Sequence, residues 1–282
     1  MGSVFEYPFR VRTDECDSLG HVNNAVYIRH LQQATIDALG SGDEDTFWNA
    51  RRLAIQYHAP VRYGDELRIA TWVIDADESL VVSGHEVTLR GKIAPVVSAR
   101  IEWVCRDYSV GRPRRVPESC IALAEAHVSA PLKPFVPPRD NGAHPFRWRH
   151  RVRRYELDVT DRVATAVYFN WLEEATVWAA NVVGWPLERM KDEDSITFQY
   201  RHDAEFFEGA SHGDEIEIVS RLISVKPIRG TWVHEVLRPV TETLLMRDYS
   251  TGAFVDWKGK IKPAPAAMME ALVQGEFAQT DG

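Results

Sequence analysis

Hydrophobic residues recur along the chain at two spacings, one helical and one extended. Steps of four, three and four residues separate Tyr27, Leu31, Ala34 and Ala38, which predicts the buried face of a helix. Alternation of apolar and polar residues is clearest over 66–76 and predicts strands with one face towards a core. The elements expected in the first half are a strand, a helix and four strands, at about 4–13, 24–39, 53–62, 66–76, 79–91 and 96–107. One long helix among so many strands packs on the face of an antiparallel sheet, so we expect the α+β class.

The second half of the chain repeats the first. Residues 166–176 (AVYFNWLEEAT) resemble residues 25–35 (AVYIRHLQQAT) at an offset of 141, which is half of the 282 residues. Further matching pairs are 64–66 with 213–215 and 85–87 with 234–236 at an offset of 149, and 106–109 with 247–250 at 141 again. Matches in the same order predict an internal duplication. The changes of offset predict an eight-residue insertion near 203–211 and extra first-half residues between 87 and 106.

Seven prolines fall within residues 113–147, where neither a helix nor a central strand can accommodate them. We therefore expect a first domain at 1–112, a proline-rich surface linker at 113–147 with a short amphipathic stretch at 118–127, and a second domain at 148–282. One short helix at 266–273 is expected in the tail.

Composition narrows the class of protein. The 33 Lys and Arg residues against 41 Asp and Glu give a net charge of −8, which argues against nucleic acid or an anionic membrane as the main partner. No apolar run is long enough to span a bilayer, and the N-terminus has no signal-peptide core. Three cysteines, an odd and sparse set, favour a reduced, cytoplasmic setting.

A polar loop leads from the first strand into the first helix, and it carries a familiar motif. The string D-x-x-G-H-V-N-N-x-x-Y at 17–27 resembles the active-site signature of hot-dog-fold thioesterases of the 4-hydroxybenzoyl-CoA thioesterase type, and 57–67 (YHAPVRYGDEL) resembles the family's next recurring segment. The resemblance implies a tandem, or double, hot dog, in which each unit has a long central helix wrapped by a curved antiparallel sheet of about five strands. It also implies a thioesterase that hydrolyses an acyl-CoA to the free acid and CoA without a cofactor.

The same residues suit that chemistry on physical grounds. Thioester hydrolysis needs an activated water or a nucleophile, which the carboxylate of Asp17 can supply. It also needs donors for the developing oxyanion, and the helix start at Asn23 and Asn24 presents free N–H groups and the positive end of a dipole. The resemblance makes Asp17 the base or nucleophile and gives the Asn24 N–H to the carbonyl oxygen. His21 and the Asn23 side chain are left to orient the loop and the water, and direct proton transfer is the equal alternative for His21.

This loop also has structural interpretations. Asp, Gly and Asn before a helix also form ordinary capped turns, and only the complete string favours catalysis. Cys16 adjoins Asp17 but points to the opposite face of an extended strand, and the spacing of Asp14, Asp17 and His21 fits no usual metal site. Tyr27 and Arg62 are expected to bind substrate.

The second copy has lost most of the motif. At the 141 offset, Asp17 is kept as Asp158. Four other motif positions differ: Gly20 is replaced by Asp161, His21 by Arg162, Asn23 by Ala164 and Asn24 by Thr165. We therefore expect a non-catalytic half that completes the substrate tunnel. The segment 155–163 resembles the non-catalytic hot dog of acyl-carrier-protein thioesterases, but those enzymes carry an Asn where this chain has Leu19, which favours acyl-CoA over an acyl carrier protein.

Several alternatives stay open. Arginines alternate over 147–153, and they either meet the phosphates of CoA or an acidic carrier protein, or keep an edge strand soluble. The competing functions are an acyl-carrier-protein thioesterase, a hot-dog enoyl-thioester hydratase or dehydratase, and a non-catalytic acyl-CoA-binding protein. The two copies provide a pseudo-dimer within one chain, to which further homo-oligomerisation can be added.

Overall fold

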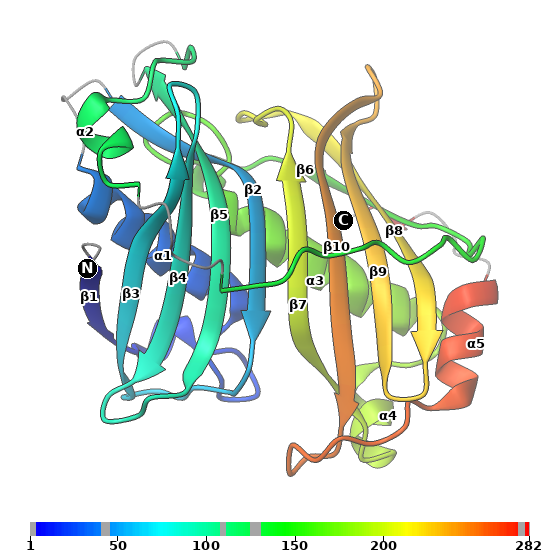
Figure 1. The fold of residues 1–282 in the computed structure, drawn as a ribbon. Helices are drawn as coiled ribbons and strands as arrows, with labels where there is room; N and C mark the ends of the chain where they lie inside the picture. Colours follow the sequence, from blue (N-terminus) through cyan, green and yellow to red (C-terminus); the bar gives the residue numbers. More distant parts are fainter. Residues whose placement is uncertain (1–3, 41–45, 108–110, 125–130, 276–279, 282) are drawn as a thin grey trace. The chain divides into compact units, whose positions relative to one another are not determined.

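The computed structural model describes residues 4–40, 46–107, 111–124, 131–275 and 280–281, and the chain divides into two compact units, Met1–Pro134 and Phe135–Gly282. The division falls within the proline-rich segment 113–147. In each unit one long helix lies against an antiparallel sheet (Figure 1). Among the described helices, none combines the length and apolar character needed to cross a membrane.

Unit 1 contains a five-stranded antiparallel sheet with the order β1-β3-β4-β5-β2. Its elements are β1 (Phe5–Arg10), α1 (Asn24–Leu39), β2 (Thr46–Tyr57), β3 (Glu66–Ala76), β4 (Val81–Leu89), β5 (Pro95–Asp107) and the short α2 (Glu118–Ile121). The helix α1 packs on β1 and β3 through the predicted face, with Leu31 fully buried. It ends at Gly40, which has a positive φ of 71° that glycine adopts without strain.

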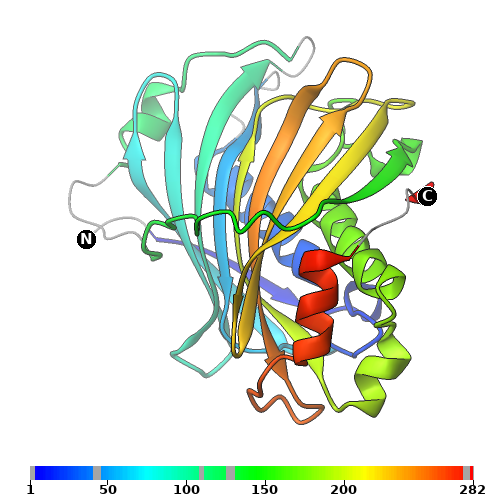
Figure 2. The same ribbon diagram turned by 90° about the vertical axis from the view of Figure 1, so that its right-hand side faces the viewer.

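Unit 2 repeats this arrangement with additions. Its sheet has the order β7-β10-β9-β8-β6-β11, and only β11 joins in parallel. The elements are β6 (Phe146–Arg151), α3 (Thr165–Val182), α4 (Leu187–Asp192), β7 (Ile196–Phe206), β8 (Glu215–Lys226), β9 (Arg229–Arg238), β10 (Thr243–Val255), α5 (Ala266–Gln274) and β11 (Thr280–Asp281). The predicted tail helix is confirmed as α5, which packs on α3 and β8 (Figure 2).

Irregularities of the two sheets coincide, which supports the duplication. Each sheet has three breaks of register, and all three correspond at an offset of 149: Ala50/Arg52 with Gln199/Arg201, Val73/Asp75 with Leu222/Ser224, and Pro95/Val97 with Leu244/Met246. A bulge is a local feature of backbone pairing, so three matching bulges are stronger evidence of common descent than short sequence matches.

The same registers correct two predictions. The offset is 141 through the long helices and 149 from β2 and β7 onwards, so the additional residues lie between α3 and β7, where α4 is found. The insertion predicted near 203–211 and the extra residues predicted between 87 and 106 were wrong. The insertion was placed too late because no sequence match falls between the helices and 64–66, so the point where the offset changes is not visible in the sequence. The extra residues were inferred from matching 106–109 to 247–250, but by register Arg247 corresponds to Ser98, and that four-residue match is a coincidence.

Two boundaries also differ from expectation. The strand predicted at 53–62 is β2, which begins at Thr46, because its bulge exposes Arg51 and Arg52 in succession and hides the alternation. The proline-rich segment is not simply a surface linker. Its Cys120 is fully buried with the thiol towards the Leu39 carbonyl, and Asn141 donates to the Leu222 carbonyl at 3.1 Å. The stretch expected at 118–127 is helical only over Glu118–Ile121, and part of it lies outside the described residues.

Candidate active site

The loop between β1 and α1 is closed on itself and anchored to the turn before β3. Backbone bridges join Cys16 to Val22 and His21 to Arg62. The Val22 N–H donates to the Val61 carbonyl at 2.9 Å. These contacts bring the predicted residues of the 17–27 motif into one compact segment at the start of the helix.

Asp17 is held by the backbone of its own loop. Its Oδ1 accepts hydrogen bonds from the N–H groups of Leu19 at 2.8 Å and His21 at 3.1 Å, and its N–H donates to the His21 carbonyl at 2.8 Å. Gly20, with a φ of 77°, allows this tight turn. Within the described chain, Oδ2 has no hydrogen-bond partner, and the residue is half-buried. One carboxylate oxygen is therefore fixed, and the other is available to a water or a substrate carbonyl.

The start of α1 supplies oriented donors. Asn23 is the N-cap, and its side-chain oxygen accepts the N–H of Ala25 at 2.9 Å. The N–H of Asn24 is the first of the helix and has no intrahelical acceptor, nor does the described part of the chain offer another. The positive end of the helix dipole lies at the same position. The Asn24 N–H can thus donate to an anionic oxygen.

Tyr27 and Arg62, expected to bind substrate, occupy different surroundings. Tyr27 is buried with its ring centroid 5.8 Å from that of Tyr57, and burial is the main cause that raises the pKa of its hydroxyl, which therefore stays protonated. Arg62 is exposed, and its backbone N–H donates to the Asp65 carboxylate at 2.9 Å. The structure brings the backbone of Arg62 beside His21 and places Tyr27 within the core.

One supporting pair was missed by the sequence reasoning. Glu15 accepts the Arg12 N–H at 2.8 Å through Oε2 and contacts His30 Nε2 at 2.9 Å through Oε1, while Phe9 stacks on the His30 ring at 3.9 Å. The backbone carbonyl of Glu15 also accepts the Asn23 N–H at 2.9 Å. Glu15 therefore ties the loop to α1. Its counterpart in unit 2 is Glu156, which accepts the indole N–H of Trp171 at 3.0 Å. A glutamate at the same position of both copies is the sequence signal that could have identified Glu15.

The corresponding loop of unit 2 keeps its shape and its aspartate, but it loses the His and Asn side chains. Asp158 accepts both the N–H and the hydroxyl of Thr160, at 2.8 and 2.5 Å, through the same Oδ1. Arg162, which replaces His21, is hydrogen-bonded to Ser211. Ala164 is the N-cap of α3 and provides no side-chain acceptor. The loop of unit 2 therefore lacks the side chains of His21 and Asn23, while Asp158 and the first N–H of the helix, that of Thr165, are kept.

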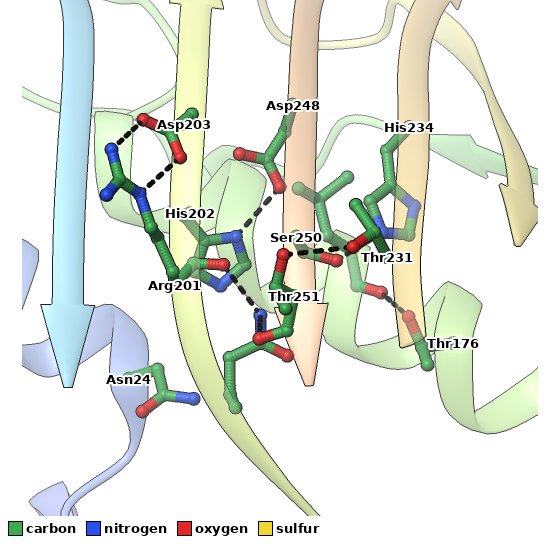
Figure 3. Close-up of polar contacts among 12 residues, drawn as sticks. Asn24, Thr176, Arg201, His202, Asp203, Thr231, His234, Asp248, Ser250 and Thr251 are labelled. Atoms are coloured by element: carbon green, nitrogen blue, oxygen red, sulfur yellow. Dashed lines mark hydrogen bonds and ion pairs between the residues drawn. The ribbon is translucent and has the colours of Figure 1, made fainter. Parts of the chain in front are cut away.

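The sheet of unit 2 contains a buried polar cluster, which the sequence reasoning did not anticipate (Figure 3). His202 Nδ1 and Asp248 Oδ2 are 2.8 Å apart, and the ring of His234 lies between the hydroxyls of Ser220 at 2.8 Å and Ser250 at 3.0 Å. Burial is the main cause that lowers the pKa of His234 to about 4, so this ring is neutral. A polar residue at an inward position of a strand is the signal for such a cluster, but its partners lie on other strands.

The arginines of β6 are paired with carboxylates on the neighbouring strand. Arg147 and Arg149 both contact Glu217, at 2.6 and 3.1 Å, and Arg151 contacts Glu215 at 3.0 Å. Their charges are therefore largely compensated within unit 2, which favours the solvated-strand interpretation over phosphate binding.

Solved structures share the fold of the chain. A suggested oleoyl thioesterase from Lactobacillus plantarum matches with a TM-score of 0.70 and 15% identity, covering 90% of this chain and 97% of the other. An acyl-ACP thioesterase from Bacteroides thetaiotaomicron matches with a TM-score of 0.68 and 15% identity, covering 88% and 97%. At this identity the likeness concerns the fold alone.

Sequence comparison gives the family. The acyl-CoA thioester hydrolase YbgC of Escherichia coli O6:H1 is 26% identical over 129 residues, which are 43% of this chain and 95% of the relative. The thioesterase-like superfamily matches residues 11–126 and again 152–272, once in each unit. The protein therefore belongs to the thioesterase-like superfamily and is a hot-dog thioester hydrolase.

Proposed function

We propose that the chain hydrolyses acyl-CoA thioesters to a free acid and CoA at one site, in the loop and helix start of unit 1. The observation that supports this most is the state of the Asp17 carboxylate. Two backbone N–H groups hold Oδ1, and Oδ2 has no partner within the described residues. A half-buried carboxylate with one anchored and one available oxygen suits a group that must act on water or on a carbonyl carbon.

In the general-base route, Asp17 Oδ2 removes a proton from water, and the water oxygen attacks the thioester carbonyl carbon. The carbonyl electron pair moves to its oxygen, where the Asn24 N–H and the helix dipole stabilise the negative charge. Collapse of this intermediate breaks the C–S bond, and the thiolate of CoA leaves with the proton that Asp17 carried. His21 and Asn23 act as positioning residues. The backbone N–H of His21 donates to Asp17, and the side chain of Asn23 caps the helix.

In the nucleophilic route, the Asp17 carboxylate attacks the carbonyl carbon, expels the thiolate and forms a mixed anhydride that water then hydrolyses. A single turnover in water enriched in ¹⁸O tests the nucleophilic route, because label found in the Asp17 side chain after digestion and mass spectrometry requires an anhydride opened at the Asp17 carbonyl. Label found only in the released acid fits the base, or an anhydride opened at the acyl carbon. Hydroxylamine separates these two cases, since it traps an anhydride as the hydroxamate and leaves the base route unchanged.

The carrier is proposed to be CoA. The YbgC relative is an acyl-CoA thioester hydrolase, and Leu19 stands where acyl-carrier-protein thioesterases carry an Asn. The alternative, an acyl-carrier-protein substrate, is tested by offering the same acyl group on CoA and on an acyl carrier protein. We expect the higher kcat/KM with CoA. A higher kcat/KM with the acyl carrier protein would identify that protein, and not CoA, as the carrier.

The proposal is tested by following thiol release from a panel of acyl-CoAs. Asp17→Asn should lower kcat by about 10² or more, the contribution of one positioned acid–base group. Formation of a hydroxyacyl product from an enoyl-CoA, without thiol release, would indicate a hydratase. Thermal stabilisation by acyl-CoA without any product would indicate a binding protein.

Unit 2 is proposed to be non-catalytic. Its loop has Arg162 in place of His21 and Ala164 in place of Asn23, so it lacks the side chains that are proposed to position the loop and cap the helix in unit 1. Tyr27 is proposed to form a wall of the acyl site, and Arg62 to contact the substrate from the exposed turn.

A further inference from the structure

A groove of about 680 Å³ lies at the end of the unit 1 sheet, formed by residues of β1, β3, β4 and the hairpin that follows β4. Its walls carry four cationic side chains and one carboxylate, namely Arg10, Arg68, Arg90, Lys92 and Glu66. An acidic chain thus has a local positive surface here. Both ribbon views place this hairpin and the loop before α1 at the same end of unit 1 (Figures 1 and 2).

Two of these cations have no ion-pair partner among the described residues. Arg90 pairs with Glu66, and this contact is the main cause that lowers the pKa of the Glu66 carboxyl. Arg68 pairs with Glu6 at 2.7 Å. By contrast, the side chains of Arg10 and Lys92 are exposed and form no hydrogen bond or ion pair within the described residues, although the charge of Arg10 also helps to lower the pKa of Glu66. The groove therefore has an excess of positive charge and two donors available to a ligand.

The groove is connected to the catalytic loop. Arg10 is the last residue of β1, and its guanidinium approaches Gly64. The Val11 N–H donates to the Asp65 carbonyl at 3.0 Å, and the Gly64 N–H donates to the Val11 carbonyl at 3.1 Å. The turn at 61–65 that supports His21 and Val22 therefore also supports the groove.

Unit 2 provides an internal comparison. By the registers of the two sheets, Arg68, Arg90 and Lys92 correspond to Glu217, Pro239 and Thr241. The remaining cation, Arg10, corresponds to Arg151, which is paired with Glu215 at 3.0 Å. Unit 1, which retains the complete 17–27 motif, therefore has cations without ion-pair partners in this groove. The described residues of unit 2 have none at the corresponding positions.

We propose that this groove binds the phosphate groups of CoA, with Arg10 and Lys92 as the contacting cations; the inference rests on the proposed acyl-CoA hydrolase function. Its volume lies within the range of small-molecule sites, about 300–1,000 Å³, whereas an acidic carrier protein needs a broader surface of about 800 Å². Ile93, on the same wall and 96% exposed, offers an apolar contact to the adenine ring.

The test measures the affinity of CoA itself, which cannot be hydrolysed, by titration calorimetry. The variant Arg10→Gln/Lys92→Gln should raise the Kd about tenfold or more, and 3′-dephospho-CoA should lose less affinity than CoA on the same substitution. The matched control is Arg151→Gln/Lys226→Gln, which removes two cations from unit 2 and should leave the Kd unchanged. The wild-type affinity should also fall with added salt.

An equal Kd for CoA in the wild type and in Arg10→Gln/Lys92→Gln would overturn the proposal, as would equal losses in the control. An unchanged Kd for CoA combined with slower hydrolysis of an acyl carrier protein would overturn it in favour of a protein carrier. Loss of CoA affinity in a chain that hydrolyses no acyl-CoA would support the groove and contradict the proposed hydrolase. Full acyl-CoA hydrolase activity at unchanged KM in Arg10→Gln/Lys92→Gln would support the proposed hydrolase and contradict the groove as the CoA site.

Discussion

Gly20 and Asp161 occupy the same position of the same turn, and both have a left-handed backbone, with φ of 77° and 56°. Each N–H donates to the carbonyl of the aspartate three residues earlier, at 3.0 Å in unit 1 and 3.2 Å in unit 2. The turn has therefore been kept in both units, and only unit 1 has the residue that adopts it without strain.

Gly20→Ala should lower the free energy of unfolding by about 1 kcal/mol, because an alanine pays for the left-handed conformation. No atom lies within 4 Å of a Cβ added there, so a steric clash is excluded as the cause. Gly20→Asn is the control, since asparagine tolerates this region. Urea unfolding measures both, and equal losses in the two variants would contradict the backbone explanation.

The N-caps of the two long helices differ only in the side chain. Asn23 and Ala164 have nearly identical backbones, with φ and ψ of −61° and 139° in one and −61° and 138° in the other. Asn23→Ala should lower the stability by about 1 kcal/mol, and Ala164→Asn should raise it by a similar amount. Thermal unfolding of both variants is the measurement. A stabilising Asn23→Ala, or no gain from Ala164→Asn, would show that the cap does not act as described.

Glu15 is expected to position the catalytic loop without touching the substrate. Glu15→Ala removes the acceptor for the Arg12 N–H and for His30, and should lower kcat more than it changes KM, by a factor of about 10. Glu15→Gln keeps an acceptor oxygen and should restore most of the rate. Steady-state kinetics on one acyl-CoA tests this, and equal rates for Glu15→Ala and the wild type would refute the role.

His85 should make the fold sensitive to acid. The ring is fully buried between Thr71 at 3.0 Å and Ser83 at 2.7 Å, and burial lowers its pKa from 6.5 to about 3. Below pH 6.5 the unfolded chain therefore binds a proton that the folded chain does not. Stability is fully present above pH 6.5 and is lost as the pH falls towards about 3.

The matched variant for this effect is His85→Gln, which does not titrate. Its stability relative to the wild type should rise between pH 7 and pH 4 by on the order of 3 kcal/mol, since each unit of pKa difference is worth about 1.4 kcal/mol. Urea unfolding at the two pH values measures the difference. A difference that does not change with pH would mean that His85 is not the titrating group.

The elements that depend on local pattern were predictable from the sequence. The helix predicted at 24–39 is α1, and the strand predicted at 66–76 is β3, because an apolar stripe or an alternation is visible in consecutive residues. The start of β2 was not, since a bulge at Arg51 interrupts the alternation. The insertion was misplaced because no sequence match lies between the helices and 64–66, and only backbone pairing shows that β7 already has the later offset.

Some residues of the candidate site were also predictable from local sequence, and others were not. Asp17, His21, Asn23 and Asn24 are neighbours in sequence, so a motif was enough to propose them. The contact of Glu15 with His30 joins residues fifteen apart, and the pairing of Arg147 with Glu217 joins residues seventy apart. Such contacts depend on strand order and register, which no local pattern contains.

The most direct test of a single active site compares Asp17→Asn with Asp158→Asn on the same acyl-CoA. The two aspartates occupy equivalent turns and accept similar backbone hydrogen bonds, so each substitution makes the same chemical change. We predict that kcat/KM falls by about 10² or more for Asp17→Asn and stays within about twofold of the wild type for Asp158→Asn. Equal losses in both variants, or a loss confined to Asp158→Asn, would contradict the assignment of catalysis to unit 1.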